Sequence, residues 1–115
     1  MSEISMEEII TELVVNGGNA RGKALEAIRA ARKNDMARAK ELLAECGEAL
    51  TKAHNFQTAF IQETMCDENS AGGNASLIMV HGQDHLMDAM VVRDLAAEMV
   101  EMYKVIYEEK KKGVK

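Results

Sequence analysis

The chain has 115 residues, of which 47% are hydrophobic and 29% are charged, and this balance excludes an intrinsically disordered protein. Its formal net charge of -5 argues against sequence-independent binding to nucleic acid, which needs a broad basic surface. With nine methionines, 3% aromatic residues and no proline, the composition predicts long helices and an all-α fold.

A first helix is predicted over about residues 6–33. Ser5 and Glu8 have the spacing of a capping box, and an apolar rhythm with helical period follows them. The segment Asn16-Gly17-Gly18-Asn19 interrupts this pattern. Because each glycine inside a helix costs about 1 kcal/mol relative to alanine, we expect the helix to be kinked or broken near Gly17-Gly18.

Two further helices are predicted, over about residues 35–65 and 77–109. Asp35 is a suitable N-cap for the first of them, and Lys110, Lys111 and Lys112 follow the second, where cations meet the negative end of the helix dipole. Residues 66–76 are rich in Gly, Asn, Ser and acidic residues and are expected to form a flexible loop. The sequence therefore predicts one antiparallel three-helix bundle spanning residues 1–115.

The third predicted helix is apolar around most of its circumference. A helix in a three-helix bundle needs only one apolar stripe, so the remaining apolar surface predicts contact with further copies of the chain. The apolar residues are Met79, Val80, Leu86, Met87, Ala89, Met90, Val91, Val92, Leu95, Ala96, Met99 and Val100.

The sequence shows no signal for export, membrane insertion or disulfide formation. The first residues lack the basic and apolar regions of a signal peptide, and no window approaches the roughly 20 apolar residues of a membrane span. Cys46 and Cys66 have no CxxC or CxxH spacing and are expected to be reduced thiols. We therefore expect a cytoplasmic protein.

Four polar residues share one face of the third helix, because His81, Asp84, His85 and Asp88 follow at i, i+3, i+4 and i+7. They could be structural groups that satisfy one another. HGQDH also has the spacing of inverted zinc protease motifs, although its acid is Asp rather than Glu and no third ligand is evident. A histidine near a helix N-terminus could instead carry a phosphoryl group. The spacing alone does not decide among these possibilities, nor does it choose between the histidines.

The segment LIMVHGQDHLMDAM, from Leu77 to Met90, resembles the active-site helix of the lactose/cellobiose (diacetylchitobiose) type of enzyme IIA in the bacterial sugar phosphotransferase system. That family typically reads L-x-V-H-A-Q-D-H-L-M-T. Residues 6–58 are also similar to the family's first two helices in length and pattern. Gly82 stands in place of the family's usual Ala, and Asp88 in place of a common Thr.

The resemblance implies a phosphotransferase component that assembles as a homotrimer of three-helix subunits. His81 would accept a phosphoryl group on Nε2 from the histidine-containing phosphocarrier protein and pass it to the cysteine of enzyme IIB, for uptake of a β-linked disaccharide of the lactose, cellobiose or chitobiose class. The resemblance also implies that Asp84 from three subunits shares one divalent metal ion. Its hard oxygen ligands favour Mg²⁺. Gln83 and His85 flank these residues and are candidate supporting groups. The alternative is a non-enzymatic helical oligomer or adaptor in which the His/Asp cluster sets the register.

Overall fold

The computed structural model of the chain describes residues 5–66 and 77–113. These residues form three α-helices, α1 (Met6–Arg32), α2 (Met36–Cys66) and α3 (Leu77–Gly113), and include no strand. The predicted all-α class is confirmed. Helix α3 continues four residues past the expected end at Glu109. The expected flexible loop lies outside the described residues, apart from Cys66, which ends α2.

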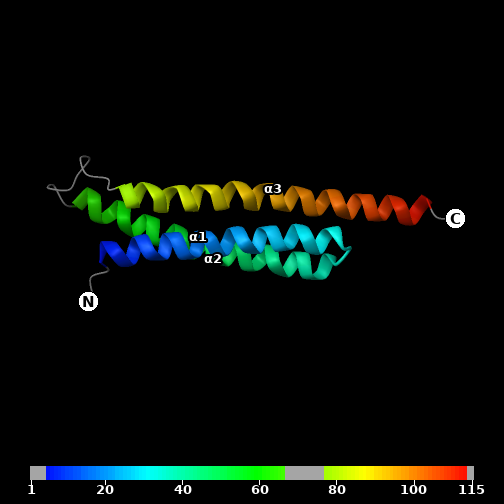
Figure 1. The fold of residues 1–115 in the computed structure, drawn as a ribbon, viewed down its shortest axis with the longest axis horizontal. Coiled ribbons are helices and arrows are strands. Elements are labelled where there is room, and N and C mark those ends of the chain that lie inside the picture. The colour runs from blue at the N-terminus through cyan, green and yellow to red at the C-terminus, as the bar shows by residue number, and fades with distance from the viewer. Residues whose placement is uncertain (1–4, 67–76, 114–115) are drawn as a thin grey trace.

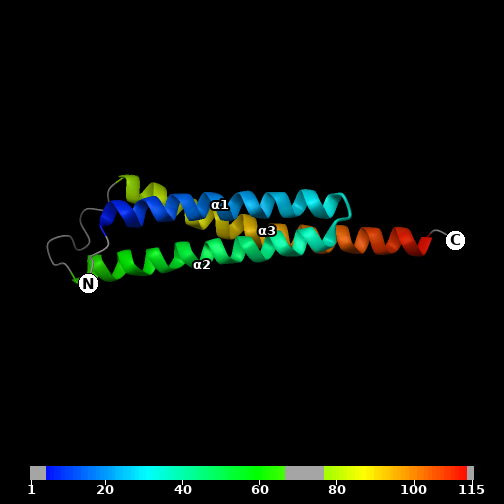
Figure 2. The same ribbon diagram turned by 90° about the horizontal axis from the view of Figure 1, so that it is seen from below.

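The three helices form an elongated bundle of 70 × 27 × 17 Å (Figure 1). Helices α1 and α2 are an antiparallel pair joined by a short turn, and α3 runs in the same direction as α1 (Figures 1 and 2). Helix α1 packs extensively against both partners, whereas α2 and α3 contact each other much less. The C-terminal part of α3 extends beyond the turn between α1 and α2 (Figure 1).

Helix ends form where the sequence supplies caps. The Ser5 hydroxyl accepts a hydrogen bond of 3.1 Å from the backbone N–H of Glu8, as its capping-box spacing predicts. Before α2, the Asp35 carboxylate accepts one of 3.2 Å from the backbone N–H of Arg38. Asn34 has a φ of 63°, which lets the chain reverse between α1 and α2, and asparagine tolerates this conformation better than most residues.

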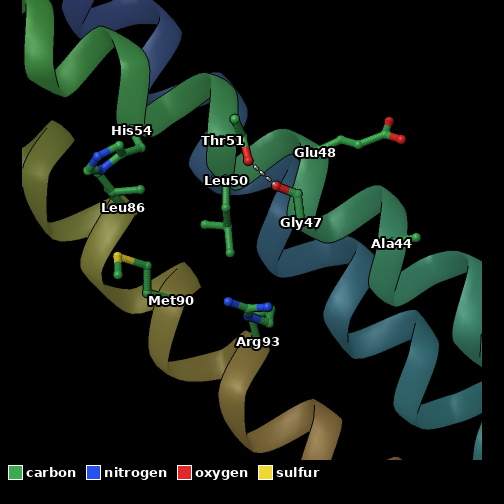
Figure 3. Close-up of a pocket in the computed structure, with 9 residues that line it drawn as sticks. All are labelled: Ala44, Gly47, Glu48, Leu50, Thr51, His54, Leu86, Met90 and Arg93. Carbon is green, nitrogen blue, oxygen red and sulfur yellow. Dashed lines mark hydrogen bonds between the residues drawn. The ribbon is translucent and has the colours of Figure 1, made fainter.

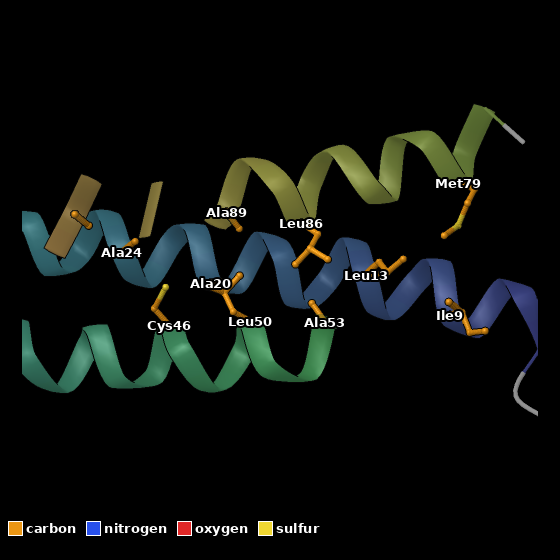
Figure 4. Packing of buried hydrophobic residues seen from close by; sticks show 11 residues of the cluster. Ile9, Leu13, Ala20, Ala24, Cys46, Leu50, Ala53, Met79, Leu86 and Ala89 are labelled. Atoms are coloured by element: carbon orange, nitrogen blue, oxygen red, sulfur yellow. The ribbon is translucent and has the colours of Figure 1, made fainter. Parts of the chain in front are cut away.

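The core is built from small and aliphatic side chains along all three helices (Figure 4). Alanines recur on the buried face of α1 at intervals of three or four residues, which lets the neighbouring helices approach closely. Ile9 and Leu13 on α1, Cys46 on α2 and Leu86 on α3 are the largest fully buried side chains. None of the described helices is long and apolar enough to cross a membrane.

The expected break at Gly17-Gly18 does not occur, because α1 continues as one helix from Met6 to Arg32. Gly17 is buried against α3, so packing there offsets the entropy that glycine costs a helix. Asn16, also buried, donates from Nδ2 to the backbone oxygen of Glu12 at 2.9 Å and to its carboxylate at 2.8 Å. The prediction that α1 is kinked near Gly17-Gly18, without being broken, stays a prediction.

Candidate functional site

The two histidines of α3 form a contacting pair. The Nε2 atom of His81 lies 3.1 Å from the Nε2 atom of His85, and the rings meet edge to face with centroids 4.5 Å apart. Residues at i and i+4 lie above one another on a helix, which brings the two rings together. His81 is exposed and His85 is half-buried. At this distance one Nε2 can donate a hydrogen bond to the other, and the tautomers of the two rings decide which one donates.

The carboxylates of the stripe do not join this pair. Asp84 and Asp88 are both exposed, and within the described ranges no hydrogen bond or ion pair links either of them to His81 or His85. The stripe expected from the sequence therefore separates into a histidine pair and two solvent-facing acids. Among the described residues, the acids do not satisfy the histidines.

Gln83 faces the opposite flank of α3 and connects it to α2. Its side-chain oxygen accepts a hydrogen bond of 2.6 Å from Nε2 of Gln57, and the pair is partly buried. This contact joins two helices that otherwise touch each other little. Gln83 thus fixes how α3 sits beside α2 and does not contact the histidine pair through this bond.

The face of α3 turned away from α1 carries a row of exposed apolar side chains. Residues three or four positions apart follow one side of a helix, and we call this row the α3 seam. It consists of Val80, Met87, Val91, Leu95 and Met102, with Asp84 and Glu98 as the charged positions that complete the spacing. A shallow depression beside its first turns is lined by Leu77, Val80, His81 and Asp84. His81 therefore stands at the edge of an apolar surface that its own subunit does not cover.

A second hollow lies between α2 and α3, where the two helices separate (Figure 3). His54 and Leu50 line it from α2, and Leu86, Met90 and Arg93 line it from α3. His54 is exposed and is not part of the histidine pair. Because His81 does not line this second hollow, the hollow is separate from the candidate site.

Among the described residues of one chain, metal ligands do not converge. No group of three or more His, Cys, Asp or Glu side chains that could hold a metal ion is present among the residues described. The inverted zinc motif suggested by HGQDH thus lacks a third ligand there. A metal at Asp84 would require carboxylates from other copies of the chain.

Two residues that support the site were not anticipated from the sequence. Gln57 gives no motif, since only the fold brings it to Gln83, which is 26 positions away. Gly17 did give a signal, because a glycine inside a helix often marks a close approach of two backbones. A Cβ at Gly17 would lie 3.1 Å from the backbone oxygen of His85.

Comparison with known proteins identifies the family. The family model described as "PTS system, Lactose/Cellobiose specific IIA subunit" matches residues 8–104. The chain belongs to the lactose/cellobiose-specific IIA family. It is 46% identical over 108 residues to the lichenan-specific phosphotransferase enzyme IIA component of Bacillus subtilis, a match that covers 91% of this chain and 93% of that relative. The N,N'-diacetylchitobiose-specific EIIA component of Escherichia coli K12 is 37% identical over 98 residues, covering 85% and 82% of the two chains.

Solved structures of IIA proteins share the fold. The cellobiose-specific enzyme IIA of Bacillus anthracis superposes with a TM-score of 0.80 at 37% identity, covering 92% of this chain and 95% of that one. The IIA(Chitobiose) protein of E. coli, solved in complex with HPr, gives a TM-score of 0.76 at 32% identity, covering 91% and 99% of the two chains. The resemblance drawn from the HGQDH segment is confirmed, and the chain is a phosphotransferase-system component that carries a phosphoryl group.

Proposed function

We propose that His81 is the residue that carries the phosphoryl group. The observation that supports this assignment is the His81–His85 pair, in which an exposed imidazole has its Nε2 held 3.1 Å from a second Nε2. If His85 is the donor in this contact, Nε2 of His81 is unprotonated and its lone pair accepts the hydrogen bond; once released from that bond, the lone pair can act as a nucleophile, while Nδ1 of the same ring carries the proton.

The bonds formed and broken in the transfer balance without a further reactant. HPr, the histidine-containing phosphocarrier protein, presents its phosphohistidine. The Nε2 lone pair of His81 attacks phosphorus, the new N–P bond forms, and the N–P bond of the donor breaks as its ring nitrogen recovers the electron pair. In the second step the cysteine thiolate of enzyme IIB attacks, an S–P bond forms, and the N–P bond at His81 breaks. The solution complex of the E. coli relative with HPr supports the choice of donor.

His85 is suited to hold the transferred group. Once Nε2 of His81 is bonded to phosphorus it can no longer accept a hydrogen bond, and the N–H of His85 is left facing the new phosphoryl oxygens. A hydrogen bond between these charged partners is shorter and stronger than one between neutral groups. His85 therefore acts as a donor beside the nucleophile, while Gln83 contributes through the packing of α2 and α3.

The α3 seam supports assembly into the expected homotrimer. Five exposed apolar side chains at helical spacing are unsuited to water, and the same face on other copies is the simplest partner for them. Such an assembly brings Asp84 of each copy toward a common axis. The carboxylates would repel one another there unless a cation or shared protons neutralised them.

A divalent ion, with Mg²⁺ the best match, fits Asp84 by the chemistry of its donors. Carboxylate oxygens are hard ligands, and within the described residues no ion pair already occupies the Asp84 carboxylate. One ion per trimer, held by three copies of Asp84, would neutralise charge and stabilise assembly. No transfer step depends on it.

The sugar is proposed to belong to the β-linked disaccharide class. Relatives of this chain are named for lichenan, N,N'-diacetylchitobiose, lactose and cellobiose. Those names differ among chains with similar sequences, which fits a carrier that hands on phosphoryl groups and leaves sugar recognition to other subunits. Such a carrier works in the cytoplasm, where HPr and enzyme IIB meet it.

Incubation with phosphoenolpyruvate, enzyme I and HPr tests the assignment. Wild type, His81→Ala and His85→Ala are compared by intact mass under alkaline conditions, which preserve phosphohistidine. We expect one acid-labile phosphoryl group in wild type, none in His81→Ala, and slower labelling in His85→Ala. A wild type that stays folded and oligomeric but gains no mass would favour the adaptor, whereas labelling of His81→Ala would move the nucleophile elsewhere.

A further inference from the structure

Gly17 packs closely against the backbone of α3 beneath the histidine pair. A Cβ built on Gly17 would lie 3.1 Å from the backbone oxygen of His85, 3.2 Å from its carbonyl carbon and 3.3 Å from its Cβ. All three distances are shorter than ordinary van der Waals contact between carbon and its neighbours. Any side chain at position 17 must therefore push α3 away from α1 at His85.

The neighbouring glycine lacks this contact. Gly18 is exposed, and a Cβ there would meet nothing within 4 Å. The two glycines share the same helix and lose the same backbone entropy on folding. The contrast between them isolates the packing of Gly17 against His85 from the effect of glycine on helix stability.

We propose that Gly17 is a positioning residue for His81: without a side chain there, α1 seats the backbone of His85 so that the His85 ring meets Nε2 of His81. The contact is with main-chain atoms and Cβ, so it sets where the His85 side chain begins. The ring of His85 is half-buried, and it moves with the backbone from which it projects. A shift of α3 by a few tenths of an ångström is then passed to the 3.1 Å contact between the two Nε2 atoms.

This inference rests on the proposed role of His81, because positioning matters to the rate only if the His81–His85 pair performs the transfer. Phosphoryl transfer depends on in-line placement, and a displacement of about 1 Å can cost about 100-fold in rate. For Gly17→Ala we expect a loss of about three- to tenfold in the rate of labelling by phosphorylated HPr, since the displacement is smaller. Gly18→Ala should label as fast as wild type.

Imidazole signals separate positioning from general destabilisation. The chain has three histidines, so the ring ¹⁵N spectrum contains one set of signals for each. In Gly17→Ala we expect the signals of His81 and His85 to change while those of His54 stay in place. Gly18→Ala should leave all three unchanged. A merely structural glycine would lower the thermal midpoint without moving the histidine signals selectively.

If Gly17→Ala does not fold, the substitution can be tested in a variant of the chain that is more stable than wild type. Gly18→Ala and Gly22→Ala both replace glycines whose Cβ would meet nothing within 4 Å, so together they should strengthen α1. Gly17→Ala is then measured within that double variant. Unchanged labelling and unchanged His81 and His85 signals, in either background, overturn the inference while leaving the proposed function intact. If wild type itself takes no phosphoryl group on His81, both the proposed function and this inference are overturned.

Discussion

Nε2 of His81 and Nε2 of His85 lie 3.1 Å apart across one turn of α3, a distance at which one ring nitrogen can donate a hydrogen bond to the other. In such a bond the accepting nitrogen is unprotonated, and its lone pair becomes available when the donor is displaced. The same contact keeps an N–H within reach of whatever becomes bonded to that nitrogen. The proposed nucleophile and the proposed donor thus lie four positions apart on one helix.

Removal of the donor should slow transfer without abolishing it. For His85→Ala we expect the labelling rate to fall about 10- to 100-fold, because a hydrogen bond to a charged group contributes about 1.5–3 kcal/mol. Quenched-flow sampling of labelled protein measures this rate. His54→Ala is the matched control, since His54 lies on α2 outside the pair. Equal rates for His85→Ala and His54→Ala would remove His85 from the site.

The metal proposal predicts a specific dependence on Asp84. In wild type, a chelator should lower the thermal midpoint and Mg²⁺ should restore it, because three converging carboxylates need a counter-charge. Asp84→Asn should lose this response. Glu98→Gln is the control, because Glu98 is an acid on the same α3 seam and should leave the response in place. A wild-type midpoint that ignores both chelator and Mg²⁺ contradicts a bound divalent ion.

The seam itself can be tested through the oligomeric state. Val91→Glu places a charge in the middle of the apolar row and should shift the protein from trimer to monomer in light scattering. Val15→Glu is a close control on α1, since Val15 is 50% exposed and Val91 is 56% exposed. If both variants stay trimeric, or if both dissociate, the seam is not the interface.

The sequence predicted the three helices from local features, whereas His81 was singled out only by the resemblance to the IIA family. Caps, helical period and the HGQDH segment are all readable over a few positions. The sequence did not predict which polar residues would meet, since Gln57 and Gln83 are brought together only by the packing of α2 on α3. Gly17 shows the same limit, because its cost to the helix is a local property and its contact with His85 is not.

Gly82 offers a stabilising substitution beside the site. A Cβ at Gly82 would lie 3.6 Å from Cβ of Leu13 and 3.9 Å from Cγ2 of Ile10, both ordinary van der Waals distances. Gly82→Ala should therefore raise the free energy of unfolding by about 1 kcal/mol while leaving the labelling rate unchanged. Urea unfolding measures the first quantity. A destabilised Gly82→Ala would show that α3 cannot accept even this contact next to His81.

The buried thiol of Cys46 predicts how stability falls at alkaline pH. Cys46 is fully buried, and this burial raises the pKa of its thiol above the ordinary 9.0, with nearby Arg93 opposing the shift more weakly. The Cys46 thiol of the unfolded chain ionises at a lower pH than the same thiol in the folded protein. The contribution of the buried thiol to stability is therefore complete below pH 9.0 and is lost as the pH rises toward the higher pKa of the folded state. The free energy of unfolding then falls by at most about 1.4 kcal/mol per pH unit for this one proton.

Urea unfolding of wild type and Cys46→Ala at pH 8 and pH 10, at fixed protein concentration, measures how much stability each protein loses. Wild type should lose more stability than Cys46→Ala between these values, and parallel losses would show that the Cys46 thiol ionises equally well in both states.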